Sequence, residues 1–222
     1  MPRSFDRIVI HTVFGTKYRD PWIDEVIEPE LHSVLAGTLI DQGCKVIEIG
    51  GTVDHVHILH TLPRTKSIAS VIGTAKRQSS AWLSEFDSAI YALFAWQEGY
   101  GAFSVDWRRV EVTARYIQNQ KAHHGSNNNR MTFRQEFEIF VEKYEVDGYD
   151  PKYIFPDPPT DHQSPVSFVL DRAVPLHKDQ PVNYTYPTST LDVLFTSDPA
   201  PLQYRSRRPR QRRRATHPRR GC

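Results

Sequence analysis

At residues 53–62 the chain reads Val53-Asp54-His55-Val56-His57-Ile58-Leu59-His60-Thr61-Leu62. The run alternates like a β-strand, so His55 and His57, two residues apart, are expected on the same face. Two imidazoles side by side on a rigid strand supply half of the ligands of a divalent metal site. The alternative is that both rings only face solvent on an edge strand. The apolar residues that follow favour a place at the mouth of a buried strand.

A second segment, Tyr116-Ile117-Gln118-Asn119-Gln120, has helical rather than strand character. Residues four apart lie on one helix face, which places Tyr116 and Gln120 one turn from each other. A tyrosine nucleophile, a neutral oxygen ligand and a histidine pair together suit metal-assisted attack on a phosphodiester. The alternative for Tyr116 is an ordinary core position with a hydrogen-bonded hydroxyl group.

The pattern of apolar residues around these segments predicts an α+β fold, with an antiparallel sheet of the ferredoxin-like kind and helices packed on it. The expected order is β-α-β-β-α-β-α, with a turn at Gly50-Gly51. Strands are expected at 5–14, 44–49 and 53–62, with one or two short strands within 94–105. Helices are expected at 24–42, 67–83, 110–124 and 132–144.

Beyond about residue 148 the composition changes. Twelve of the 16 prolines lie from Pro151 onward, and nine arginines without any acid lie within residues 204–222. Subtracting these nine charges from the net charge of +2 leaves −7 for residues 1–203. We therefore predict a catalytic domain at 1–147 and an extended, disordered Pro/Arg-rich arm at 148–222.

The bulk composition indicates a soluble protein. No apolar run approaches the roughly 18–20 residues that cross a bilayer, and the N-terminal residues lack the apolar core of an export signal. The two cysteines, Cys44 and Cys222, form neither a disulfide framework nor a cysteine zinc site. These features predict a cytoplasmic protein without a membrane segment.

Five motifs carry a resemblance to a known family. In chain order they are His11–Lys17 (HTVFGTK), Gly50–Leu59 (GGTVDHVHIL), Lys76–Trp82 (KRQSSAW), Trp96–Val105 (WQEGYGAFSV) and Tyr116–His124 (YIQNQKAHH). In these motifs the chain resembles the single-tyrosine, His-hydrophobic-His transposases of small bacterial insertion sequences, including relatives associated with repetitive extragenic palindromes (REP). The resemblance covers roughly residues 5–145. The Pro/Arg-rich arm has no counterpart in the compact family domain.

The resemblance implies a mechanism and a substrate. His55 and His57 would bind Mg²⁺ or Mn²⁺, Gln120 would supply the third ligand, and Tyr116 would be the nucleophile. Attack on single-stranded DNA would leave a 5′-phosphotyrosine and a free 3′-OH. The family recognises hairpin-bearing element ends and forms homodimers in which the tyrosine helix of one subunit completes the metal site of the other.

Alternatives remain open at this stage. A replication initiator or relaxase also uses a histidine pair and a tyrosine, and a domesticated copy would bind DNA without cleaving it. Candidate DNA contacts are Lys76, Arg77, Ser79 and Trp96. Lys76 and Arg77 could instead form a solvated helix face, and Trp96 could belong to the sheet core.

Overall fold

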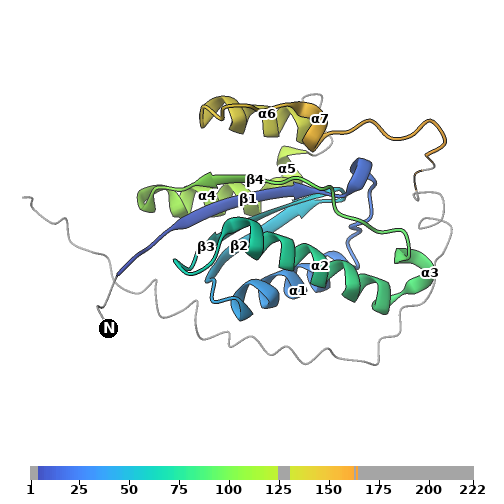
Figure 1. Ribbon diagram of the computed structural model, residues 1–222, viewed down its shortest axis with the longest axis horizontal. Helices are drawn as coiled ribbons and strands as arrows, with labels where there is room; N and C mark the ends of the chain where they lie inside the picture. Colours follow the sequence, from blue (N-terminus) through green and yellow to red (C-terminus); the bar gives the residue numbers. More distant parts are fainter. Residues whose placement is uncertain (1–4, 125–130, 163, 165–222) are drawn as a thin grey trace, which may run out of the picture. The chain divides into compact units, whose positions relative to one another are not determined.

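Four antiparallel strands form one sheet in the order β2-β3-β1-β4 in the computed structural model (Figure 1). The strands are β1 (Val9–Gly15), β2 (Val46–Thr52), β3 (His55–Thr61) and β4 (Gly101–Ser104). The structure describes residues 5–124, 131–162 and 164, all within the first of two units of the chain, Met1–His177. This strand order, with one helical connection after β1 and another after β3, confirms the predicted ferredoxin-like α+β fold.

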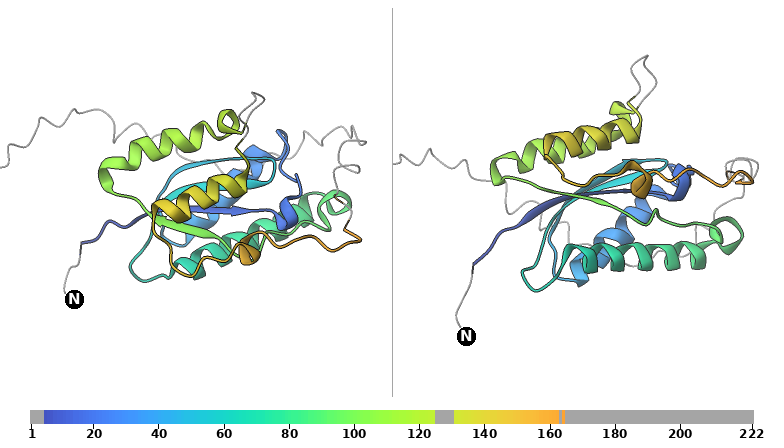
Figure 2. Two further views of the ribbon diagram at one scale, coloured as in Figure 1. Left: turned by 90° about the horizontal axis from the view of Figure 1, so that it is seen from above. Right: turned by 45° about the horizontal axis from the view of Figure 1, so that its top comes forward.

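The helices are α1 (Glu28–Asp41), α2 (Ile68–Phe86), α3 (Ser88–Tyr91), α4 (Val110–Gln118), α5 (Gln120–His123), α6 (Phe133–Lys143) and α7 (Pro151–Ile154), with single 3₁₀ turns η1 (Lys17–Arg19) and η2 (Trp107–Arg109). Helices α1 and α2 cover one face of the sheet, whereas α4 and α6 lie on the other (Figures 1 and 2). The sheet is therefore buried between two helical layers.

The two central strands distribute their side chains between these layers by simple alternation. Phe14 and Ile58 face α1 and α2 in one hydrophobic cluster. His11, His55 and His57 lie on the opposite face, under α4 and α6. All three histidines are at most 2% exposed, because β1 and β3 are the inner strands of the sheet.

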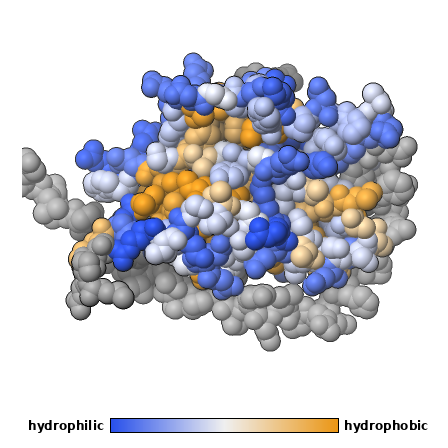
Figure 3. All heavy atoms as spheres, in the orientation of Figure 1, coloured by the Kyte–Doolittle hydropathy of each residue, from blue (hydrophilic) through white to orange (hydrophobic). Residues whose placement is uncertain are grey.

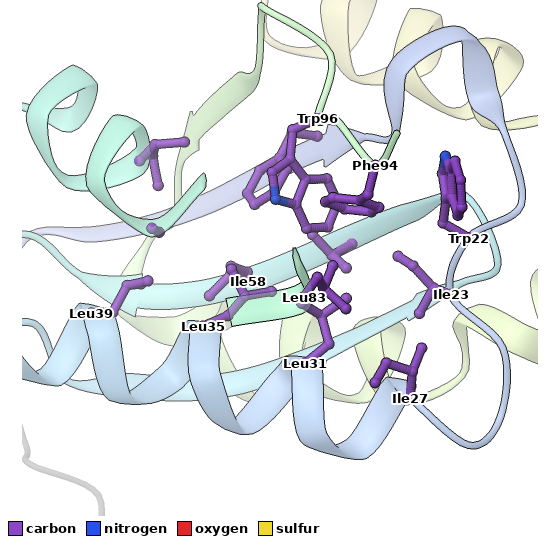
Figure 4. Packing of buried hydrophobic residues seen from close by; sticks show 14 of the residues in the cluster. Trp22, Ile23, Ile27, Leu31, Leu35, Leu39, Ile58, Leu83, Phe94 and Trp96 are labelled. Carbon is purple, nitrogen blue, oxygen red and sulfur yellow. The ribbon is translucent and has the colours of Figure 1, made fainter. Parts of the chain in front are cut away.

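The layer beneath α1 and α2 is the main hydrophobic core. Its packing is shown in Figure 4, where the labelled side chains from α1, α2, β3 and the segment before β4 converge. Among them are the fully buried Leu31 and Leu35 of α1. This core fixes the sheet from one side, whereas the other side carries two smaller hydrophobic clusters around the buried histidines.

On that other side, the tyrosine-bearing helix α4 approaches the sheet closely at Gly50. A Cβ atom at Gly50 would lie 2.4 Å from the carbonyl oxygen of Ile117, so a larger residue would push α4 off the strand. Gly50 and Gly51 are part of β2, where they pair with His57 and Val56. The predicted turn at Gly50-Gly51 is therefore wrong: the chain needs small residues there for close packing, and it turns between β2 and β3 instead.

Local capping explains where two of the predicted helices begin. Ser67 precedes α2 and accepts a hydrogen bond from the Ser70 backbone N–H. Thr132 and Gln135 form a reciprocal capping box at the start of α6. The single helix predicted at 110–124 is interrupted at Asn119, which ends α4 before α5 begins.

The packed domain continues past the predicted boundary at residue 147. The rings of Tyr149 and Phe155 contact Phe137 of α6, and His162 forms a 3.0 Å ion-pair contact with Asp20. Part of the segment predicted as a disordered arm thus packs beside α6 against its buried face (Figure 2), because its few aromatic residues add apolar surface that no periodic pattern shows. The remainder of the predicted arm, 165–222, lies outside the described residues.

The surface in Figure 3 is largely hydrophilic and carries a hydrophobic patch in the region of α4 and β4. None of the helices in the described part of the chain has the length and apolar character needed to cross a membrane. Cys44 is a buried free thiol.

Candidate metal and tyrosine site

β3 presents His55 and His57 towards α4 and α6, as its alternation predicts. The two rings are 5.1 Å apart between centroids, and their side chains are 1% and 0% exposed. The alternative in which both rings face solvent is excluded, because the helices bury them.

A chain of polar contacts fixes the orientation of His55. Its Nδ1 lies 2.7 Å from the Asp54 carboxylate and 2.9 Å from the Thr52 hydroxyl, and Asp54 is ion-paired with Arg19. Burial lowers the pKa of His55 to about 4, although Asp54 opposes this effect. The imidazole is therefore neutral near pH 7, and a proton on Nδ1 leaves the Nε2 lone pair free for a metal.

Arg19 holds an uncommon backbone conformation. Both Tyr18 and Arg19 have positive φ values, 56° and 67°. Non-glycine residues rarely adopt this region, and such strain is concentrated at functional sites. The strained turn brings the Arg19 guanidinium to Asp54 and over the ring of Phe133, 4.3 Å from its centroid.

His57 is oriented by another histidine. Its Nδ1 lies 3.0 Å from Nε2 of His11 on the neighbouring strand, a contact that the sequence analysis did not assign. The Nε2 atom of His57 is buried and makes no hydrogen bond of good geometry, although a carboxylate oxygen of Glu136 on α6 lies 3.3 Å from it.

Glu136 on α6 is the main site residue that sequence reasoning missed. One carboxylate oxygen lies 3.3 Å from Nε2 of His57, 3.6 Å from Nε2 of His55 and 3.1 Å from Nε2 of His124. Burial alone would raise the pKa of Glu136, but its contacts with His124 and His57 hold the pKa well below the ordinary value. The result is a buried carboxylate that stays charged at neutral pH.

A signal for Glu136 was present in the sequence. Phe133, Phe137 and Phe140 are all buried and mark the apolar face of α6. Glu136 stands among them at helical spacing, where an apolar residue is the ordinary choice. An acid on an apolar helix face is rarely buried without a partner, and the partner here comes from β3.

Tyr116 and Gln120 meet the same carboxylate from α4 and α5. The Tyr116 hydroxyl donates a hydrogen bond to Glu136, and Nε2 of Gln120 donates another at 2.8 Å. Oε1 of Gln120 lies 3.4 Å from Nε2 of His55. Burial and the negative charge of Glu136 raise the pKa of Tyr116 above its ordinary value. The break at Asn119 keeps Tyr116 and Gln120 on one side and turns Gln120 inward.

The donor set fits a divalent metal ion. The ligand atoms of His55, His57 and Glu136 lie within 4.8 Å of one another, and all three residues are buried. Nε2 of His57 faces the Glu136 carboxylate at 3.3 Å without a hydrogen bond of good geometry, which is an arrangement suited to two atoms that would bind one ion. Two imidazoles and a carboxylate suit Mn²⁺ and related ions, and they leave positions for phosphate oxygens.

The four predicted DNA contacts lie apart from this site. Ser79 and Trp96 are buried, and the indole N–H donates a 2.9 Å hydrogen bond to the Ser79 hydroxyl. The Lys76 ammonium donates to backbone carbonyls between β4 and α2, including that of Gln97 at 2.9 Å. Arg77 is the one of the four whose side chain is fully at the surface. Their DNA contact stays a prediction, and their positions favour Arg77 over Ser79 and Trp96.

Comparison with known proteins identifies the family. The family model described as "Transposase IS200 like" matches residues 4–120, which is more than half of the 222 residues. No protein among the curated sequences matches.

Two solved structures are similar to the chain. One is a protein from Deinococcus radiodurans R1 assigned as a transposase, with 18% identity, a TM-score of 0.45, and coverage of 54% of this chain and 96% of that one. The other is a REP-associated tyrosine transposase bound to a REP hairpin, with 13% identity, a TM-score of 0.42, and coverage of 74% and 94%. The family assignment rests on the sequence match, which contains His55, His57, Tyr116 and Gln120. This chain belongs to the family of IS200-like transposases.

Proposed function

We propose that this transposase cleaves and rejoins single-stranded DNA through a covalent phosphotyrosine at Tyr116, at a divalent metal site formed by His55, His57 and Glu136. The observation that carries the proposal is the position of Glu136. Its carboxylate touches both imidazoles on one side and the Tyr116 hydroxyl on the other. A nucleophile and a metal-ligand set are thus in direct contact.

The proposed step is an exchange of phosphodiester bonds. The Tyr116 oxygen attacks a DNA phosphorus atom and forms the 5′-phosphotyrosine, while the bond from that phosphorus to the 3′-oxygen breaks. The phenol loses its proton and the departing 3′-oxygen gains one. Rejoining reverses the step with the 3′-OH of another strand. The number of phosphoester bonds stays constant, so no nucleotide cofactor is needed.

Each protein group has a distinct task in this step. Bound Mg²⁺ or Mn²⁺ would supply positive charge to the phosphate oxygens. His55 and His57 present Nε2 to the site because Asp54 and His11 hold their Nδ1 atoms. Glu136 orients the Tyr116 hydroxyl through their hydrogen bond. Gln120 donates to the same Glu136 oxygen as Tyr116 and offers its own oxygen as a further ligand.

The predicted shared site in a homodimer is part of this proposal. In the described chain, Tyr116 lies against His57 of the same chain, with ring centroids 6.2 Å apart. A single chain therefore contains every group that the step needs. Exchange of the tyrosine helices between two subunits would use the same contacts, with α4 of one chain meeting β3 of the other.

Covalent trapping tests the proposal. Full-length protein is incubated with a 5′-labelled or 3′-labelled hairpin-bearing single strand in Mn²⁺ or Mg²⁺, and adducts are separated under denaturing conditions. We expect an adduct that carries the 3′ portion of the strand and requires metal. Tyr116→Phe is the matched control, because it removes one oxygen and keeps the ring. Binding without any adduct would favour a DNA-binding protein that does not cleave, and an adduct in Tyr116→Phe would exclude Tyr116 as the nucleophile.

A further inference from the structure

A hollow of about 310 Å³ opens beside Tyr116 on the side away from the sheet edge β2. It lies between α4 and α6, and Tyr116, Glu136 and His11 contribute to its lining. Its volume is at the lower end of the range of roughly 300–1,000 Å³ in which proteins hold small ligands. The hollow therefore has space for about one nucleotide unit next to the tyrosine.

Apolar side chains surround this hollow although they face solvent. Val112 of α4 is 50% exposed and Ile139 of α6 is 48% exposed, and both line the hollow. Trp107 in η2 is 65% exposed and lies two residues before the lining residue Arg109. Exposed apolar groups gathered around a hollow mark an interaction surface.

Cations stand among these apolar groups. Arg109 and Lys143 line the hollow from the start of α4 and the end of α6. The Arg108 guanidinium lies 5.3 Å from the centroid of the Trp107 ring. Asp106, which also lines the hollow, accepts a 2.8 Å hydrogen bond from the Arg108 backbone N–H and so caps η2. Exposed aromatic and basic groups together are the combination that binds unpaired nucleotides.

The spacing fits a strand that runs along α4. Trp107 precedes Tyr116 by two to three helical turns, which corresponds to about 10–15 Å along the axis. This distance spans a few nucleotides of a single strand. A strand held at Trp107 would therefore pass Arg109 and Lys143 before it reaches Tyr116.

We propose that Trp107, Arg109 and Lys143 form a single-stranded DNA subsite that leads into the hollow at Tyr116, with an unpaired base stacked on Trp107 and phosphates bound by the two cations. This subsite rests on the proposed function in one respect: the bound strand leads to Tyr116 because Tyr116 is the proposed nucleophile. It also replaces Trp96 by Trp107 as the tryptophan that meets DNA. Trp96 is 8% exposed and packs inside the domain, whereas Trp107 is accessible.

The test is equilibrium binding of a short fluorescein-labelled oligothymidylate to the full-length protein, followed by anisotropy in the presence of EDTA. Trp107→Ala should weaken binding roughly tenfold or more, because stacking on an aromatic ring is lost. Trp107→Phe should retain most of the affinity. A duplex of the same length should bind both variants as it binds the parent protein, since paired bases cannot stack on the ring. Unchanged oligothymidylate affinity in Trp107→Ala would overturn the proposal, and so would an equal loss for the duplex.

The salt dependence of DNA affinity distinguishes this subsite from a DNA-binding surface around Arg77 on α2. Arg109→Gln and Lys143→Gln should each reduce the slope of log affinity against log salt by about 0.7, the value for one phosphate of a single strand. Arg77→Gln is the comparison variant for the competing surface, because Arg77 is an exposed arginine on the opposite helical layer. A slope reduced by Arg77→Gln and not by Arg109→Gln would place the strand on α2 and contradict the subsite.

Intrinsic fluorescence gives a second readout. The oligothymidylate should quench tryptophan emission in the parent protein and in Trp82→Phe, but not in Trp107→Phe. Because none of these measurements needs metal or cleavage, they remain informative if no tyrosine adduct forms. Conversely, the adduct could form while the variants keep their oligothymidylate affinity, salt slope and fluorescence quenching. The proposed function would then stand and the subsite would be wrong.

Discussion

Glu136 and His57 are in direct contact, with one carboxylate oxygen 3.3 Å from the imidazole Nε2, although they come from α6 and β3. This contact joins the part of the chain that matches the family, residues 4–120, to a helix that follows it. The metal-ligand set expected from the sequence contains two histidines and a glutamine. The structure places the buried carboxylate of Glu136 beside the two histidines, which makes the charge of this group of side chains more negative by one unit.

Replacement of Glu136 should weaken metal binding more than replacement of Gln120. We expect Glu136→Gln to lower Mn²⁺ affinity at least about tenfold, because the site loses its one anionic ligand. His55→Ala and His57→Ala should remove measurable binding, since each loses a direct ligand. Isothermal titration measures the Mn²⁺ affinity of Glu136→Gln, His55→Ala and His57→Ala and compares it with that of Gln120→Ala. Glu138→Gln, a surface residue two positions further on α6, is the control, and equal affinity in Glu136→Gln and Glu138→Gln would contradict the ligand role.

Asp54→Asn should impair metal binding without touching the metal. Asp54 accepts from Nδ1 of His55 and so leaves Nε2 free. Loss of such a supporting carboxylate typically costs about 10- to 100-fold in metal affinity. NMR of the His55 ring nitrogens would show whether the tautomer changes in Asp54→Asn. Asp41→Asn on the exposed end of α1 is the control, and a normal tautomer with normal affinity in Asp54→Asn would refute the positioning role.

Mixing of two inactive variants decides whether the site is shared between subunits. Tyr116→Phe and His57→Ala should each fail to form the covalent adduct. If the tyrosine helix works on the site of another chain, co-expressed variants should regain some activity, because one composite site in the mixed dimer is intact. If each chain uses its own helix, as the contacts within one chain allow, activity should stay absent in a verified heterodimer.

Lys76 should make stability depend on pH above neutrality. Burial lowers its pKa to about 8, whereas an unfolded lysine has a pKa of about 10.4. Between these values the unfolded chain binds more protons, so the contribution of Lys76 to stability rises with pH, by up to about 3 kcal/mol. Below about pH 8 both states are charged and the contribution is constant. Urea unfolding of the parent protein and Lys76→Met at pH 7.5 and pH 10 tests this, and a pH-independent difference between the two would contradict it.

Two truncations separate the packed segment from the basic tail. A chain ending at residue 164 should fold like the full protein, whereas a chain ending at residue 147 should lose about 1–3 kcal/mol. The shorter chain lacks Phe155, whose ring packs on Phe133 and Phe137. The chain ending at 164 also lacks the nine arginines, so its affinity for DNA should depend less steeply on salt. Equal stability of the two truncations would show that the packing of Phe155 is unimportant.

Several features of the fold follow from short stretches of sequence alone. The alternation around His55 and His57 places both rings on one face of a strand, and strand geometry has no other outcome for residues two apart. Ser67 and Thr132 predict where α2 and α6 begin, because a helix cap involves only neighbouring residues. The order of these elements was sufficient to predict the ferredoxin-like sheet.

Other features needed the three-dimensional structure. Gly50 was taken for a turn residue because its partner, the carbonyl of Ile117, is distant in sequence. The sequence left open whether Trp96 meets DNA or packs in the core, and its burial and contact with Ser79 became visible only in the structure. In each case the residue type allows two roles, and a distant neighbour selects one.

The sequence by itself determined the histidine pair and the sheet that carries it, because local backbone periodicity fixes these relationships; the break at Asn119 between Tyr116 and Gln120 was not predictable in this way. Only the tertiary structure decided that Glu136 closes the site and that His11 supports His57. Those contacts join side chains from separate elements, and their positions depend on how α6 and β1 pack against β3 rather than on any local pattern.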